Sequence, residues 1–512
     1  MNVMSEQFLQ YNILDSCCTL QARNEFWHEL QEGYMPAYNM TMRLFEPLIF
    51  MQTRGLAVDL AMLEVTKVEI EKALGEKQEE LNKIVGRPLN ANSPQQVAAY
   101  FYVEKGIPPY LNSEGGVTTD DGAMQRLAKP TAKRKGFREA KLIQEIRSYV
   151  KLKSSYLEVV VDSDGRLRCS WNPRGTKFGR LSSSETVFGT GLNLQNLHPL
   201  FKKFIRADDD CFFVEVDKRQ AEWVIMAYLS QDGNMLKVIE EGRDPHLYTA
   251  SMMFNVPEEI VLLDNKVVGY ERDPEIIIGL RAKVPDLARL SMKLPRNYGA
   301  RQVGKHANHG LNYDEGYIRF ATEWELLESY AKWCVERYHQ VYPGIRKYYE
   351  WVKRELNKDR TLINCFGRKM KFMDQWGNDL FKAAYASMPQ STQVDGLNTG
   401  MCSIYEDPYI CASDATNADL MAQVHDSILL QFPNKVLLPE YNFYGTMKHV
   451  YDLVSPEMEY HNRRFKIPTD MKVGRNWGAH QETNPLGMQE VVLGESPTQF
   501  LSDLRTVLGV TT

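Results

Sequence analysis

Two apolar, strand-like runs in this 512-residue chain each carry an aspartate, although the aspartates lie more than two hundred residues apart. Asp217 closes the run 211–216, and Asp426 lies within the run 423–430. The stretch 246–384 between them has the periodicity of helices. The two aspartates can act together only if the two runs are neighbouring strands of one sheet.

A pair of carboxylates on rigid strands is what two-metal phosphoryl transfer needs. Two divalent ions about 3.5–4 Å apart stabilise the attacking and leaving oxygens, and strands hold their ligands in place. Either aspartate alone is more typical of a turn or a helix cap. The pair, with the cationic segment that lies between them in the sequence, favours a functional site.

That cationic segment is residues 301–313. One helical stripe, spaced four residues apart, carries Arg301, Lys305, His309 and Tyr313. Arg and Lys can grip a triphosphate, and the two rings can stack on a base. Gly304 and Gly310 weaken a helix and indicate that something approaches its backbone closely. An ordinary amphipathic helix with solvated cations is the alternative.

Local signals predict the remaining elements. Asp59 and Ser93, the latter followed by Pro94, are typical helix N-caps. A hairpin should turn at His425-Asp426. The other expectations are a helix at 141–157 with Lys151 and Lys153 on one side, a strand at 166–171, a loop at 175–196, a helix at 221–229, and a loosely packed polar tail after Gly478.

These residues resemble the motifs of family A DNA polymerases, the bacterial polymerase I group. Asp217-Lys218-Arg219-Gln220-Ala221-Glu222 is similar to their first motif (D-x-x-Q-x-E), Arg301-x3-Lys305-x7-Tyr313 to their fingers helix, and Gln423-Val424-His425-Asp426 to their third motif. Further similarity, in family order, lies at 151–156, 179–183, 193–196, 244–246, 366–368 and 389–392. The sequences Pro389-Gln390-Ser391-Thr392 and His425-Asp426-Ser427 resemble those of the phage members of the family.

The resemblance implies a role for each matching residue. Asp217, Asp426 and the Lys218 carbonyl would bind two Mg²⁺ ions, or Mn²⁺ in their place. The residues implied to hold the triphosphate are Arg301, Lys305 and His246. Those implied at the incoming nucleotide are Gln220, Glu222, His309 and Tyr313, with Glu222 blocking a ribose 2′-OH and Tyr313 lying at the template base. Those implied to contact primer–template DNA are Arg180, Asn196, Gln390, His425, Lys151 and Lys153.

The chain departs from the family pattern at five places. His309 stands where the family has Phe or Tyr, Asp314 where it has Gly, and Ser427 where it often has Glu. Residues 186–192 look like an insertion, and residues 262–298 do not match cleanly. Stacking and sugar discrimination at His309 are therefore open.

Tyr11 and Asp15 resemble the Y-x3-D motif that closes the 3′–5′ exonuclease domain of this family. The earlier acidic motifs of that domain would lie upstream, so we expect a remnant and a possible exonuclease subunit or processivity factor as a separate partner. A chance Tyr and Asp on a surface helix is the alternative.

Composition limits the setting. Net charge is −5, so a DNA contact must come from a lined cleft and not from the whole surface. Eight scattered cysteines without C-x-x-C argue against a zinc site or a disulfide scaffold. No apolar run reaches the ~20 residues that span a bilayer. We expect a cytoplasmic protein, in the host cell if phage-encoded, with no membrane partner.

We therefore expect an α+β right hand with an antiparallel palm sheet, helical fingers and a helical thumb, which adds dNTPs to a primer 3′-OH on a template. A single-subunit RNA polymerase and a degenerate, non-catalytic primer–template binding protein are the rivals. The predicted domains are an exonuclease remnant at 1–24, connecting helices and thumb at 25–160, palm at 161–245, fingers at 246–384, and palm with C-terminal tail at 385–512.

Overall fold

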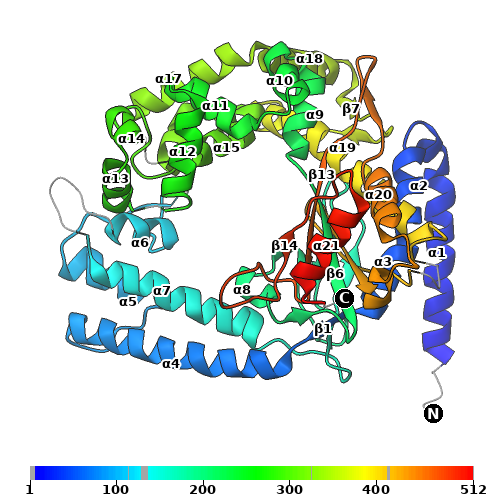
Figure 1. Cartoon of the computed structure of the whole chain (residues 1–512), viewed down its shortest axis with the longest axis horizontal. Helices are drawn as coiled ribbons and strands as arrows, with labels where there is room; N and C mark the ends of the chain where they lie inside the picture. The colour runs from blue at the N-terminus through cyan, green and yellow to red at the C-terminus, as the bar shows by residue number, and fades with distance from the viewer. Residues whose placement is uncertain are drawn as a thin grey trace.

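The computed structural model describes residues 6–112, 115–128, 136–271, 273–324, 326–411 and 416–510. At its centre is the palm sheet, five antiparallel strands in the order β14-β13-β6-β10-β9. In Figure 1 this sheet lies between a group of helices at the top and a blue-to-cyan group at the bottom. The strands are β6 (Cys211–Lys218), β9 (Asp419–Val424), β10 (Ser427–Pro433), β13 (Thr469–Gly474) and β14 (Gln489–Glu490).

Strand β6 is the middle strand of the palm sheet, and its apolar run forms the buried centre of that sheet. Its side chains alternate between the two faces of the sheet, and nearly all are buried. Asp217 lies opposite Ser427 of β10 and Asp470 of β13. The hairpin β9–β10 turns at His425-Asp426, as predicted. The two sequence-distant runs are therefore neighbouring strands.

The palm core packs helices against this sheet. The residues 44–63, 152–216 and 397–508 supply one apolar cluster. Its helices are α2 (Met35–Arg43), α3 (Phe45–Arg54), α8 (Pro199–Lys202), α19 (Asn378–Glu406), α20 (Phe443–Val454) and α21 (Pro497–Leu508). Helix α1 (Glu6–Gln31) runs beside α2 at the edge of the molecule (Figure 1).

The segment predicted as fingers, 246–384, belongs to a second, helical body with an apolar core of its own, which also includes buried residues 221–238 of the predicted palm segment. Its helices are α9 (Ala221–Ser230), α10 (Gly233–Glu240), α11 (Pro245–Phe254), α12 (Glu258–Val268), α13 (Pro274–Ala282), α14 (Pro285–Leu290), α15 (Ala300–Gly310), α16 (Tyr317–Trp324), α17 (Glu328–Val341) and α18 (Pro343–Asp359). The 3₁₀ turn η4 (Leu311–Tyr313) follows α15.

The segment predicted as connecting helices and thumb, 25–160, contains a smaller helical body around a third apolar cluster from residues 81–146. Asp59 and Ser93 cap their helices as predicted. The helix predicted at 141–157 begins earlier and changes to a π-helix before its end. The elements are α4 (Leu60–Val85), α5 (Pro94–Ala98), η1 (Ala99–Glu104), α6 (Asp121–Ala128), α7 (Arg138–Leu152) and η2 (Lys153–Leu157).

Short strand pairs complete the fold, and two local predictions were incomplete. The strand predicted at 166–171 is two strands, and the loop predicted at 175–196 contains a strand and the 3₁₀ turn η3 (Leu194–Asn196). The minor strands are β1 (Leu56–Val58), β2 (Arg166–Leu167), β3 (Ser170–Asn172), β4 (Ser182–Ser184), β5 (Ile205–Arg206), β7 (Thr361–Ile363), β8 (Lys369–Lys371), β11 (Met458–Tyr460) and β12 (Arg463–Phe465).

The prediction of a loosely packed tail was wrong. Helix α21 buries Phe500, Leu504 and Leu508 in the palm core, four residues apart on one face. The polar residues between them hid that short stripe. Among the described helices, none is long and apolar enough to cross a membrane.

Candidate active site

Asp217 and Asp426 meet at one end of the palm sheet. Asp217 is the seventh residue of β6, and Asp426 occupies the β9–β10 turn directly beside it. The Lys218 backbone N–H donates to the Asp426 carbonyl at 3.1 Å, which ties the two chain segments together. Both aspartates line one cavity of about 520 Å³.

Burial and neighbouring acids disfavour the charged form of both carboxylates. Burial, and next the charge of Asp426, raise the pKa of Asp217 to about 6. Burial and the charge of Glu222 raise the pKa of Asp426. The Gln393 amide of α19 donates to Asp426 Oδ1. Buried like charges of this kind are relieved by a cation, so the pair fits a divalent metal, whose preferred ligands are carboxylate and carbonyl oxygens.

The donor set is small. Among the described residues, no group of three or more His, Cys, Asp or Glu side chains has a metal-binding arrangement. The resemblance implies the Lys218 backbone carbonyl as a third ligand from the protein. The Lys218 side chain is buried, its Nζ has no hydrogen-bond partner, and burial lowers its pKa to about 7.

Helix α15 brings its cations to the same cavity. Arg301, Lys305 and His309 all line it. Arg301 is already held by a carboxylate, because its Nε and Nη2 donate to Asp244 Oδ2 at 3.0 and 2.7 Å. Lys305 has no hydrogen bond or ion pair with any described residue, so its charge is available to a ligand.

The prediction of a single α-helical stripe ending at Tyr313 was wrong at its last member. Helix α15 ends at Gly310, and Tyr313 lies in the 3₁₀ turn η4. Its hydroxyl donates to Glu222 Oε2 at 2.5 Å. The tighter turn places Tyr313 in a second cavity of about 480 Å³, which Glu222, His309 and Gln390 also line.

The sequence predicted that something approaches the backbone closely at Gly304 and Gly310. In the structure, other residues of the protein make these close approaches. A β-carbon at Gly304 would lie 2.4 Å from the His246 carbonyl oxygen of α11. A β-carbon at Gly310 would meet the Glu315 carboxylate. Gly304 therefore lets α11 and α15 pack closely enough to place His246 beside the cations.

His246 is buried near the start of α11, whose N-cap is Asp244. Burial lowers its pKa to about 3, so the imidazole is neutral. The Asn308 amide donates to His246 Nδ1 at 3.0 Å, which leaves the proton on Nε2. Asn308 was missed at the sequence level, although it lies three residues after Lys305.

Glu222 links two parts of the site. Its Oε1 accepts from Arg180 Nη2 at 2.7 Å, while its Oε2 accepts from Tyr313. Gln220, in the left-handed region with φ 54°, is the residue that precedes α9. It lines the main cavity together with Arg180 and His425.

Three residues implied to contact DNA lie outside both cavities. The Asn196 carbonyl accepts from the Tyr156 hydroxyl at 2.7 Å. Lys153 is paired with Glu71 at 2.8 Å, whereas Lys151 is exposed in the last turn of α7. Any phosphate contact by Lys153 would compete with that ion pair.

Two departures from the family pattern have a clear structural setting. Asp314 follows η4 with φ 63°, the left-handed conformation that glycine adopts without strain. Ser427 donates to Glu215 Oε1 at 3.1 Å.

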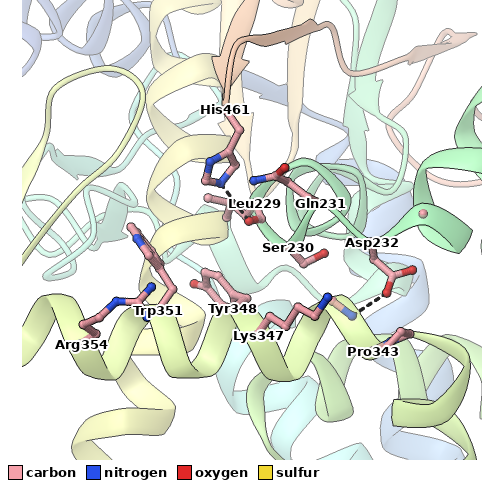
Figure 2. A pocket seen from close by; sticks show the side chains of 12 residues that line it. Leu229, Ser230, Gln231, Asp232, Pro343, Lys347, Tyr348, Trp351, Arg354 and His461 are labelled. Carbon is pink, nitrogen blue, oxygen red and sulfur yellow. Dashed lines mark hydrogen bonds between the residues drawn. The ribbon is translucent and has the colours of Figure 1, made fainter.

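A further pocket, of about 430 Å³, lies at the C-terminal end of α9. Figure 2 shows Lys347, Trp351 and Arg354 of α18 on one side and His461, which contacts the Leu229 carbonyl, on the other. This pocket contains none of the predicted site residues.

A family model described as "DNA polymerase family A" matches residues 60–266 and 294–479. The chain belongs to DNA polymerase family A. The unmatched stretch between the two segments falls within the region 262–298 that fits the motifs poorly. It contains α13 and α14.

This chain of DNA polymerase family A is similar to bacterial DNA polymerases I. It is 28% identical over 459 residues to the thermostable DNA polymerase I of Thermus filiformis, covering 84% of this chain and 46% of the relative. It is 23% identical over 511 residues to DNA polymerase I of Chloroflexus aurantiacus, covering 94% and 47%. The chain thus spans about half the length of these relatives.

A solved structure has the same fold. It is the POL domain of Pol1 from M. smegmatis in complex with DNA primer-template and dNTP, with a TM-score of 0.69 and 23% identity. The match covers 86% of this chain and 70% of that one. The α+β right hand, with its antiparallel palm sheet, helical fingers and helical thumb, is confirmed.

Proposed function

We propose that this chain is a template-directed DNA polymerase that adds dNTPs to a primer 3′-OH. One observation carries the proposal: a single cavity collects Asp217 and Asp426 on one side and the cations of α15 on the other. Its chemistry is nucleotidyl transfer, for which positioning and electrostatic stabilisation suffice. Family membership and the separate palm, fingers and thumb cores support it.

The carboxylates would hold two Mg²⁺ ions, or Mn²⁺, with the Lys218 carbonyl as a further ligand. When bound, the ions supply positive charge for the attacking and leaving oxygens. The protein's own part is to keep Asp217 and Asp426 together through the Lys218–Asp426 backbone bond.

The triphosphate would be bound by the opposite wall. Lys305 offers an unpaired charge, and Arg301 must exchange Asp244 for phosphate. Neutral His246 presents an Nε2–H that can donate to a phosphate oxygen. Because its pKa lies near 3, His246 stores no proton, which favours Lys305 as the acid for the pyrophosphate leaving group. A pH–rate profile unchanged by Lys305→Gln would contradict that assignment.

Sugar and base selection would fall to the linked pair Glu222 and Tyr313, with Gln220 and His309 beside the nucleotide. A carboxylate held from both sides, by Arg180 and Tyr313, is a fixed obstacle to an added 2′-hydroxyl. His425, Gln390, Asn196, Lys151 and Lys153 are proposed primer–template contacts.

Primer extension by the full chain tests the proposal. Parallel reactions with dNTPs and NTPs should show dNTP preference, and Asp217→Asn should abolish extension. Preference for NTPs would favour the single-subunit RNA polymerase. Tight primer–template binding without any extension would favour the degenerate binding protein.

A finer proposal concerns the setting. The resemblance at 389–392 and 425–427 supports a role in phage DNA replication, in the host-cell cytoplasm. Tyr11 and Asp15, which resemble an exonuclease motif, lie on exposed turns of α1. A separate exonuclease subunit and a processivity factor are the candidate partners. Magnesium-dependent 3′ trimming by this chain alone would count against a separate exonuclease subunit.

A further inference from the structure

Ser427 occupies the position at which the family often carries a glutamate. It lies directly opposite Asp217 in the β6–β10 register, so the two side chains are on the same face of the palm sheet. A glutamate there would add a negative charge beside the metal-binding pair. This chain has a hydroxyl instead, which lies 3.1 Å from both the Glu215 carboxylate and the Val424 carbonyl and can donate its proton to either.

Glu215 stands on the neighbouring strand, two residues before Asp217, and therefore on the same face. Its side chain is largely buried, with 9% of the residue exposed. The Trp477 indole N–H donates to the same Oε1 at 3.1 Å. Oε2 accepts no hydrogen bond from any described residue. On the other neighbouring strand, β13, the residue directly opposite Glu215 is the cation Lys472.

We propose that Glu215 supplies, from β6, the acidic charge that family members often place after the metal-binding aspartate on β10. The hydrogen bond to Ser427 brings its carboxylate to within 3.1 Å of the side chain at the position it replaces. Glu215 is thus a positioning residue, which acts through Asp217 on the affinity for the divalent cation. The inference rests on the proposed polymerase function.

A purely structural role is the competing explanation. Glu215 also fastens the segment after β13 to the palm sheet through Trp477, and that bond needs an acceptor oxygen but no charge. The variant Glu215→Gln separates the two roles, because its amide oxygen still accepts from Ser427 and Trp477 while the charge is lost.

The experiment measures Mn²⁺ binding to the full chain by the electron paramagnetic resonance signal of free Mn²⁺. We expect Glu215→Gln to weaken binding roughly tenfold, as loss of an outer-sphere partner typically does. Adding Ser427→Glu to that variant should return the affinity to within about threefold of wild type, since the charge is then restored from β10. The Mg²⁺ concentration for half-maximal primer extension should follow, with kcat at saturating metal nearly unchanged.

The matched control is Asp419→Asn at the far end of β9. It removes another carboxylate of the palm sheet, one bonded to Arg54, and should lower stability while leaving Mn²⁺ affinity unchanged. Wild-type affinity in Glu215→Gln, or no recovery in the double variant, would overturn the inference. Unchanged Mn²⁺ binding in Asp217→Asn would instead overturn the metal site of the proposed function.

Discussion

The packing of α11 against α15 should be intolerant of a single methyl group at Gly304. The β-carbon of Gly304→Ala would lie 2.4 Å from the His246 carbonyl oxygen and 2.9 Å from Ala250 Cβ. Neither neighbour is a flexible side-chain end, so the helices must separate by about 1 Å to restore ordinary contact. Overpacking costs about 1–3 kcal/mol, and the better helix propensity of Ala returns about 1 kcal/mol. We expect a net destabilisation of up to about 2 kcal/mol.

The same shift should impair turnover far more than folding. Lys305 lies on α15 and His246 on α11, so separating the two helices moves these side chains apart. A 1 Å misplacement of such groups can lower the rate about a hundredfold. Urea unfolding and the kcat/KM of single-nucleotide primer extension measure the two effects.

The matched control is Gly279→Ala in α13, where an added β-carbon meets nothing within 4 Å. That change should stabilise the protein by about 0.5–1 kcal/mol and leave kcat/KM unaltered. If Gly304→Ala behaves like the control in both measurements, the close-packing argument is wrong.

Three further results are expected. Asp314→Gly should stabilise the protein by about 0.5–1 kcal/mol, because it removes a left-handed Asp; a lower melting temperature would contradict this. In metal-free protein, burial and Asp426 raise the pKa of Asp217 to about 6, so the folded state holds a proton that the unfolded state has already lost. Asp217 should therefore contribute a fall of roughly 3 kcal/mol in unfolding free energy as pH rises from about 4 to 7, and Asp217→Asn should remove that contribution; an unchanged slope in the variant refutes it. Glu222→Ala should lower the dNTP-over-NTP ratio of kcat/KM at least ~10-fold, whereas a constant ratio would exclude Glu222 as the gate.

The strand runs and the cationic helix were predictable because their signals are local and strong. Asp217 and Asp426 each end or interrupt an apolar run, and the four-residue spacing of Arg301 and Lys305 indicates one helix face. What periodicity cannot supply is the partner that each side chain finds. The Asp244–Arg301 ion pair joins residues 57 positions apart, and its existence depends on how α11 packs on α15.

Other features escaped because they depend on backbone geometry. Tyr313 continued the four-residue spacing, yet the chain tightens to a 3₁₀ turn after Gly310. Helix α21 escaped because only three apolar residues define its buried face. Gln393 lies in a segment whose side chains are almost all buried, so no amphipathic pattern marks it as the donor to Asp426.

The Lys218–Asp426 backbone bond fixes part of the geometry of the cavity. Asp217 and Asp426 are held by neighbouring strands of the first apolar core, whereas Arg301 and Lys305 lie on a helix of the second core. Any displacement of one core relative to the other would therefore change the distance between acids and cations while leaving the two acids at the same distance from each other.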